Sequence, residues 1–274
     1  LGWKKTLRVG SVLIALLQRL HLTPKRLGFP RIPIFQRPLV PSGDDVWLFT
    51  GCVMDAWMRD THRAVQRVLE STGVGVAFPD KRASCCGALH VHAGLAPEAR
   101  RLALRTMESF PGTAPILVDS AGCGAQLKDY GHLLDTDTAR KFSERVLDVH
   151  EWLAQHLDEL PPKSEPSPRI VVQDPCHLRH VQRTHESVYE VLGRYVDTVP
   201  LNDDGLCCGA GGAYSTFHPE IASDVRERKI QAIEETGAEE VASANPGCLL
   251  HLRSGGLEVR HPLEIVDALI TKDD

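Results

Sequence analysis

The sequence predicts an α/β protein composed of two pseudo-repeated Rossmann-like units, each with a short parallel sheet. The eight cysteines of the 274-residue chain form two copies of one pattern: a lone Cys, a Cys-Cys-Gly, and a last Cys behind a small turn. Runs rich in β-forming residues also alternate with helical runs in the same order in both copies, as in parallel sheets covered by helices. Because each set of cysteines follows an expected strand, the cysteines should lie at the strand C-terminal ends, where ligands collect in such sheets.

The first copy has four expected strands, and helical runs separate them. The first strand ends at Cys52, the second precedes Cys85 and Cys86, the third leads into Cys123, and the fourth ends at His150. The expected strands are 46–50, 74–78, 115–119 and 146–149, and the expected helices are 61–71, 97–110 and 151–157.

The second copy repeats this order. Its strands lead to Cys176, to the pair Cys207 and Cys208, to Cys248, and to His261. The expected strands are 169–173, 196–199, 240–243 and 257–260, and the expected helices are 185–195, 219–236 and 263–270.

Linker composition divides the chain into three parts. Residues 1–44 contain a basic, partly amphipathic stretch and then a proline-rich connector, so they are expected to form a helix and a tether. Residues 160–168 contain four prolines, which neither a helix nor a central strand tolerates. The first unit is therefore placed at 45–160 and the second at 168–274, and each is expected to bury its own core.

Composition excludes several classes of protein. With 42% hydrophobic and 24% charged residues, the chain has the composition of a globular protein rather than of a disordered or fibrous one. A net charge of −5 with no basic stripe predicts no nucleic-acid partner. The apolar run 12–17 is shorter than the roughly 20 residues that span a bilayer. We expect no transmembrane segment.

The first residues of the chain indicate whether it is a fragment, and its cysteine content indicates its cellular compartment. The chain opens without Met and without the cleavage site of a secretory signal, so we interpret it as a fragment of a longer polypeptide. Eight cysteines are too few for a disulfide-stapled secreted domain of this size, which favours a reducing, cytoplasmic location with thiolate ligands.

The adjacent cysteines favour a polynuclear metal site. Two neighbouring residues closing on one tetrahedral ion form a small strained ring, whereas two irons of a cluster accept them more easily. Mononuclear zinc normally uses Cys-x2-4-Cys pairs, which this chain lacks. Structural zinc in one or both copies, and buried inert or disulfide-bonded cysteines, remain the alternatives.

Several motifs resemble a known family, the Cys-Cys-Gly domain proteins of the heterodisulfide reductase type, and most closely the iron–sulfur subunit of glycolate oxidase. The resemblance covers about residues 45–274. The motifs that carry it are Cys85-Cys86-Gly87-Ala88-Leu89-His90, Ser120-Ala121-Gly122-Cys123-Gly124-Ala125, Asp174-Pro175-Cys176-His177-Leu178, Leu206-Cys207-Cys208-Gly209-Ala210-Gly211-Gly212 and Ala244-Asn245-Pro246-Gly247-Cys248-Leu249.

The resemblance implies an electron-transfer subunit of a flavin-dependent glycolate oxidase or dehydrogenase. Such a subunit works beside FAD-containing subunits and passes electrons to a membrane quinone pool or a similar acceptor; related subunits serve lactate oxidation. Peripheral association with the inner face of the cell membrane is left open. The chain alone is expected to have no complete active site and no catalytic residue, because it shows no Ser-His-Asp spacing, phosphate-binding loop or metalloprotease helix.

Two departures from the family pattern limit what the resemblance implies. The glycolate oxidase subunit also has a ferredoxin-like domain with Cys-x-x-Cys runs, which are absent here. Ser120 and Asn245 stand where the heterodisulfide reductases have a fifth cysteine. Four thiolates per copy suit one 4Fe-4S cluster each and argue against a noncubane cluster and against disulfide cleavage.

The predicted ligands are therefore all eight cysteines. The rival hypothesis is a non-redox docking module held together by zinc or by no metal, and an autonomous thiol–disulfide reductase is a third. Four histidines are candidates for a supporting role. His150 and His261 could donate to cluster sulfur or serve as extra ligands, and the alternative is a helix-start or surface position. His90 and His177 lie close enough in sequence to the cysteines to tune a cluster, and the alternative is capping or packing. His62 and His185 are assigned no role.

Overall fold

The computed structural model describes residues 4–23, 31–34, 37–163 and 168–270. The predicted 160–168 linker and the 1–44 segment therefore lie partly outside the described residues. No helix among the described residues is long and apolar enough to cross a membrane.

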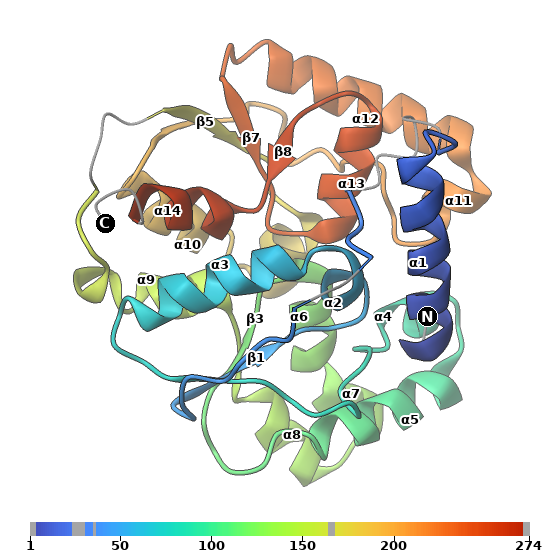
Figure 1. The fold of residues 1–274 in the computed structure, drawn as a ribbon, viewed down its shortest axis with the longest axis vertical. Coiled ribbons are helices and arrows are strands. Elements are labelled where there is room, and N and C mark those ends of the chain that lie inside the picture. Colours follow the sequence, from blue (N-terminus) through green and yellow to red (C-terminus); the bar gives the residue numbers. More distant parts are fainter. Residues whose placement is uncertain (1–3, 24–30, 35–36, 164–167, 271–274) are drawn as a thin grey trace.

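Two four-stranded sheets, both entirely parallel, form the framework (Figure 1). Their strand orders are equivalent, β2-β1-β3-β4 and β6-β5-β7-β8, which confirms the predicted pair of repeated α/β units. The first sheet contains β1 (Val46–Phe49), β2 (Val76–Ala77), β3 (Ile116–Val118) and β4 (Val146–Asp148). The second contains β5 (Arg169–Val172), β6 (Asp197–Val199), β7 (Glu240–Ala242) and β8 (Val259–Arg260).

The helices of the first half are more numerous than the sequence predicted. Short helices fill the loops that hold the cysteines. The helices up to the linker are α1 (Lys4–Arg19), α2 (Val53–Trp57), α3 (Arg59–Glu70), α4 (Ala88–His92), α5 (Ala96–Met107), α6 (Ala121–Lys128), α7 (Tyr130–Leu134), α8 (Asp137–Ser143), α9 (Val149–Ala154) and the 3-10 turn Leu157–Glu159.

The helices of the second half are η3 (His177–Gln182), α10 (Glu186–Gly193), α11 (Tyr214–Phe217), α12 (Pro219–Glu234), α13 (Pro246–Ser254) and α14 (Pro262–Ile270). The three helices predicted in the second half are present as α10, α12 and α14, whereas a π-helix after Cys176 and the helices α11 and α13 were not predicted. In the first half α9 follows β4 directly, and in the second half a single residue, His261, separates α14 from β8. The Asp148 side chain caps α9 in a capping box with Glu151, which ends β4 one residue before the predicted strand end.

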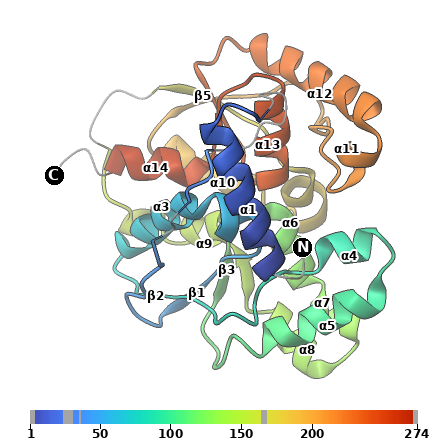
Figure 2. The same cartoon turned by 45° about the vertical axis from the view of Figure 1, so that its right-hand side comes forward.

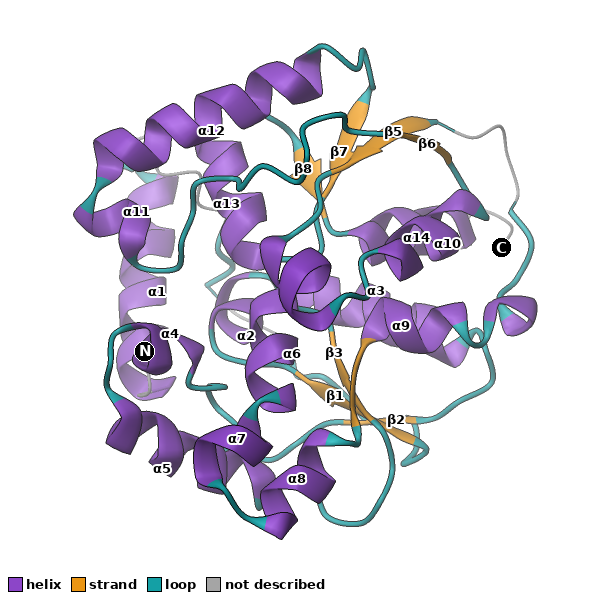
Figure 3. Ribbon diagram, turned by 180° about the vertical axis from the view of Figure 1, so that it is seen from behind, coloured by secondary structure: helices purple, strands orange, loops and turns teal. Residues whose placement is uncertain are grey.

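The expectation of a separate core in each unit is wrong. One cluster of buried apolar side chains runs through both halves, because α3 and α9 of the first half pack against α14 and α10 of the second. Figures 1 and 3 show these four helices as a layer between the two sheets. Its members include Val65 and Val68 on α3, Trp152 on α9, Val191 on α10 and Val266 on α14. Removing either half would therefore expose the core of the other.

Polar contacts also join α3 of the first half to α14 of the second. The Arg67 guanidinium donates to both carboxylate oxygens of Asp267, at 2.8 and 2.5 Å, and the Thr61 hydroxyl donates to Glu264 at 2.6 Å. The two halves thus form one body, with the C-terminal ends of both sheets directed toward the same region.

Candidate metal centre

The first four cysteines occupy the loops that follow β1, β2 and β3. Cys52 immediately precedes α2, and Cys123 lies in the first turn of α6. Cys85 and Cys86 precede Gly87, whose φ of +89° turns the chain sharply into α4. Glycine favours this left-handed conformation because it has no Cβ. Residues far apart in the sequence therefore meet at one edge of the sheet.

The second four occupy equivalent places. Cys176 immediately precedes η3, Cys248 lies in the first turn of α13, and Cys207 and Cys208 precede Gly209, which has a φ of +87°. Cys207 is exposed, whereas Cys208 and Cys248 are buried. The near-identical φ values at Gly87 and Gly209 show that the two Cys-Cys-Gly turns have the same geometry.

The thiols of each half contact one another in a chain of pairs. In the first half, hydrogen bonds join Cys52 to Cys85, Cys85 to Cys86, and Cys86 to Cys123. All eight cysteines are free, without disulfides. Among the described residues, no group of three or more His, Cys, Asp or Glu side chains is arranged around a single metal position.

In the second half, the same chain of hydrogen bonds joins Cys176 to Cys207, Cys207 to Cys208, and Cys208 to Cys248. Both foursomes line one cavity of about 470 Å³. The structure thus brings together every cysteine that the sequence singled out.

Protons are unevenly shared within the first foursome. Hydrogen bonds from Cys52 and Cys86 lower the pKa of the Cys85 thiol to about 3. The same contact with Cys85 raises the pKa of Cys52, and the contact with Cys123 raises that of Cys86, both with burial adding to the effect. Because neighbouring thiolates repel one another, all four sulfurs can be charged together only beside a compensating cation.

The second foursome shows the same asymmetry. Hydrogen bonds from Cys176 and Cys208 lower the pKa of Cys207 to about 2, and the bond from Cys208 also lowers the pKa of Cys248. The pKa values of Cys176 and Cys208 are raised, chiefly by their contacts with Cys207. In both halves the first cysteine of the vicinal pair is therefore the preferred thiolate.

Hydrogen-bond donors surround the sulfurs of the second site. The Gly209 amide donates to Cys207 Sγ at 3.4 Å, and the Asn245 side-chain amide donates to Cys248 Sγ at 3.4 Å. The ammonium group of Lys229, only 1% exposed, forms an ion pair with Asp203 and lowers the pKa of the nearby thiols. Donors of this kind tune the potential of iron–sulfur clusters.

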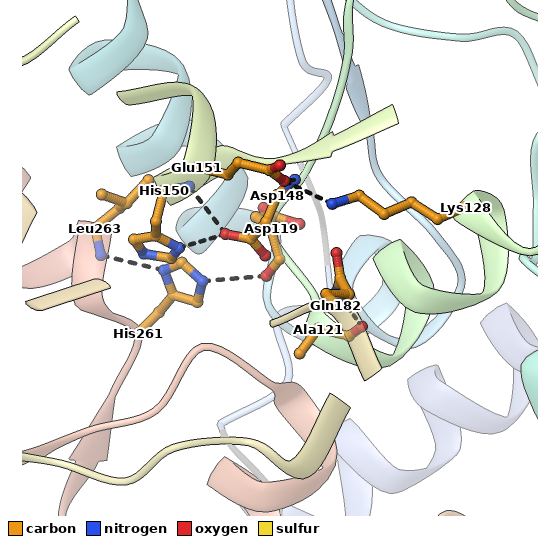
Figure 4. Close-up of polar contacts among 9 residues, drawn as sticks. All are labelled: Asp119, Ala121, Lys128, Asp148, His150, Glu151, Gln182, His261 and Leu263. Carbon is orange, nitrogen blue, oxygen red and sulfur yellow. Dashed lines mark hydrogen bonds and ion pairs between the residues drawn. The ribbon is translucent and has the colours of Figure 1, made fainter. Parts of the chain in front are cut away.

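The two sites share a wall where the N-termini of α6 and α13 meet. The Ala121 amide donates to the Ala244 carbonyl at 3.1 Å, and the Gly122 amide donates to Asn245 Oδ1 at 3.2 Å. From the second half, Gln182 donates to the Ala121 carbonyl at 2.9 Å (Figure 4). Asn245 therefore contacts both halves, with its oxygen on the first and its amide nitrogen on a sulfur of the second.

Sequence reasoning missed this role of Asn245, and it missed Lys229 and His92 altogether. The ring of His92 lines the cavity and stacks on that of His177 at 5.8 Å. Burial, and then the neighbouring His92, lower the pKa of His177. Lys229 precedes Ile230 by one residue and Ile233 by four, which places it on the buried side of α12. A lysine at such a position is the signal in the sequence that could have indicated its role.

The predicted histidines divide into two groups. His177 lines the cavity, as expected of a residue that tunes the site, whereas His90 does not line it. His150 and His261 are both fully buried and also lie away from the cavity lining, so they are neither surface residues nor placed to donate to the cysteine sulfurs. His185 stands at the start of α10 without a cavity role.

His150 and His261 instead meet between the halves. Figure 4 shows their imidazoles next to each other, with ring centres 5.5 Å apart. His150 Nδ1 contacts Asp148 at 2.8 Å, and His261 Nε2 donates to the Asp119 carbonyl at 3.1 Å. Burial, followed by the proximity of His150, lowers the pKa of His261 to about 4. The pair joins the two fourth-strand ends across the interface.

His62, to which the sequence assigned no role, contacts Asp119, the residue whose carbonyl accepts the hydrogen bond from His261. Its Nδ1 contacts Asp119 Oδ2 at 2.6 Å and its Nε2 contacts the Thr50 carbonyl at 3.0 Å. Burial by itself disfavours the charged imidazole, but the Asp119 carboxylate outweighs it and raises the pKa of His62. His62 thus joins the residues that follow β1 and β3, Thr50 and Asp119, shortly before the cysteines of those loops.

Comparison with known proteins gives two matching segments and several relatives. The family model described as "Cysteine-rich domain" matches residues 46–128 and 170–253, one segment in each half. The glycolate oxidase iron-sulfur subunit of Escherichia coli (strain K12) is 32% identical over 86% of this chain and 61% of its own length. The probable glycolate oxidase iron-sulfur subunit of Bacillus subtilis (strain 168) is 30% identical over 85% of this chain and 54% of its own.

A lactate utilization protein matches this chain over almost its whole length. Lactate utilization protein A of Bacillus pumilus (strain SAFR-032) is 27% identical over 81% of this chain and 95% of its own length. The chain thus spans little more than half the length of the glycolate oxidase subunits, but nearly all of the lactate utilization protein.

Proposed function

Because the chain belongs to the cysteine-rich domain family, we propose that it is an iron–sulfur electron-transfer subunit of a flavin-dependent 2-hydroxy-acid oxidase or dehydrogenase. The observation that carries the proposal is the convergence of eight free cysteines, in two matching chains of thiol contacts, on one cavity. A function built on electron transfer needs no catalytic residue on this chain.

The donor set fits iron–sulfur clusters. Soft thiolates are the usual ligands of such clusters, and N–H groups directed at sulfur are their usual surroundings. Four thiols that contact one another in sequence, two of them from adjacent residues, suit a cluster with several iron atoms better than a single metal ion. The proposed ligands of the first 4Fe-4S cluster are Cys52, Cys85, Cys86 and Cys123, and those of the second are Cys176, Cys207, Cys208 and Cys248.

Each part of the protein then has a defined task. A bound 4Fe-4S cluster accepts and releases one electron at a time. The cysteines hold the clusters, the Gly209 and Asn245 amides stabilise charge on sulfur, and the buried Lys229, which is paired with Asp203, acts as a positive charge on the thiols of the second site. A nearby positive charge favours the reduced state, so we propose that the second site has the higher potential and receives electrons from the first.

The proposed partners are FAD-containing subunits that oxidise the 2-hydroxy acid. Glycolate is the first candidate substrate, because two relatives above are glycolate oxidase iron-sulfur subunits. Lactate is the second candidate, because the chain covers 95% of a lactate utilization protein and only 61% of a glycolate oxidase subunit. Co-purification with a flavoprotein, followed by assays with both acids, distinguishes the two.

Cluster binding is tested on anaerobically purified protein supplied with iron and sulfide. We expect about eight iron atoms per chain and broad visible absorption that bleaches with dithionite. Cys86→Ser and Cys208→Ser should each lose about half of the iron. Ser120→Ala, the matched control at the position where reductases of this type have a fifth cysteine, should keep all of it.

Colourless protein with stoichiometric zinc would refute the proposal and support a docking module. Loss of iron in Ser120→Ala would contradict the count of four thiolates in the first site. Turnover of a disulfide by the isolated chain would support the thiol–disulfide reductase instead.

A further inference from the structure

One face of α1 packs on the protein and the other is exposed. On the packed face Ala15 is fully buried, the buried Ser11 accepts a hydrogen bond from Trp57 Nε1 at 2.8 Å, and Gln18 accepts one from the Ile32 amide at 2.9 Å. The exposed face carries several large apolar side chains. Figure 2 shows α1 on the outside of the molecule.

The outward apolar side chains form a continuous row. Val9 is 72% exposed, Leu13 59%, Leu16 46%, and Leu20, just beyond the helix end, 65%. Spacings of four, three and four residues place them on one side of the helix. Single exposed leucines are ordinary, but a row of this kind marks an interaction surface.

The charge of the surrounding segment indicates what that surface contacts. Residues 1–43 contain eight Lys and Arg residues and neither Asp nor Glu. The remaining residues carry 31 − 8 = 23 basic and 36 acidic side chains, a net charge of −13. The segment that carries the apolar row thus has a net positive charge, whereas the rest of the chain is net negative.

Basic side chains continue beyond α1. A cavity of about 430 Å³ is lined by Trp57, the α2 residue that contacts α1, and by arginines of the connector and of neighbouring helices. Among the described residues that line it, two are acidic, Asp60 and Glu264, and Asp60 is paired with Arg63. The arginines are Arg31, Arg37, Arg59, Arg63 and Arg253.

We propose that the outer face of α1 binds to an anionic lipid bilayer, with the helix lying in the plane of the interface. An exposed apolar row in a segment whose charged residues are all basic is the pattern of interfacial helices, since the apolar side chains enter the acyl boundary and the cations approach lipid phosphates. Lipid binding depends on α1 itself and not on iron.

The consequence for electron transfer rests on the proposed function. Trp57 contacts α1 through Ser11 and also lines the cysteine cavity. Docking through α1 therefore brings this cavity close to the bilayer, where a lipid-soluble electron acceptor resides.

The test is sedimentation of the full chain with vesicles. Vesicles of phosphatidylcholine containing phosphatidylglycerol should bind the protein at least about tenfold more tightly than pure phosphatidylcholine, and added salt should weaken the binding. The double variant Leu13→Glu, Leu16→Glu should lose about tenfold or more of this affinity. Leu104→Glu, on α5 and 53% exposed, is the matched control and should bind like wild type.

Three results would overturn the proposal. The wild-type chain could remain in the supernatant with anionic vesicles, or the α1 variant could bind as tightly as wild type. A third contrary result is an oligomer that the α1 variant dissociates while neither protein binds lipid, because a protein would then cover the row. Failure of cluster assembly with normal lipid binding would refute the proposed function alone.

Discussion

Replacing the glycine of each Cys-Cys-Gly turn by alanine should affect the two halves very differently. Both glycines have a φ near +90°, a conformation that costs an alanine roughly 1–2 kcal/mol. Gly87 has room for a Cβ, whose nearest neighbour, on Ala99, would be 3.5 Å away. At Gly209 the added Cβ would lie 2.4 Å from the Ala222 carbonyl oxygen.

The cost of each substitution follows from these distances. Gly87→Ala should lower the free energy of unfolding by the conformational term alone, about 1–2 kcal/mol. Gly209→Ala adds an overpacking cost of roughly 1–3 kcal/mol, because α12 must move to restore ordinary contact. The total for Gly209→Ala is therefore about 2–5 kcal/mol. Gly237→Ala, with a φ of +62° and no atom within 4 Å, calibrates the conformational term.

Urea unfolding measures the stabilities, and iron analysis after anaerobic reconstitution reports the sites. Gly209→Ala should also lose iron from the second site, since the turn that presents Cys207 and Cys208 moves with α12. Gly87→Ala should retain close to the wild-type iron content. Equal costs for the two substitutions, or a greater loss of iron in Gly87→Ala, would refute this reasoning.

Three further predictions concern polar side chains near the second site and between the halves. Asn245→Ala should lower the reduction potential of the second site, because the N–H donated to Cys248 sulfur is lost; an unchanged potential in a redox titration would contradict this. Lys229→Met should cost about 3–5 kcal/mol in urea unfolding by leaving the buried Asp203 carboxylate unpaired, and adding Asp203→Asn should recover part of the loss. The pKa of His261 is about 4 when folded and near 6.5 when unfolded, so the unfolded chain binds more protons between these values and stability should fall by roughly 3 kcal/mol as pH drops from about 6.5 to 4. His261→Gln should flatten that part of the profile, and an unaltered slope would assign the acid sensitivity to other groups.

Much of the framework could be predicted because it depends on local pattern. The β-rich run before Cys52 and the apolar run before Cys123 became strands β1 and β3. The short helices α4 and α7 were missed, since helices of five residues have no periodicity to detect. The separate cores were predicted wrongly, because the apolar face of a helix such as α3 does not specify which half it covers.

The sequence by itself determined that two foursomes of cysteines end equivalent strands, since the repeat and the turn glycines are local properties of the chain. Only the tertiary structure decided that both foursomes line one cavity, that Asn245 donates to a sulfur and the buried Lys229 lowers the pKa of nearby thiols, and that His150 meets His261 between the halves. Each of these depends on how the two halves, or elements distant in the chain, pack together. The pattern of apolar and polar side chains indicates which side chains are buried, but it does not specify which element they pack against.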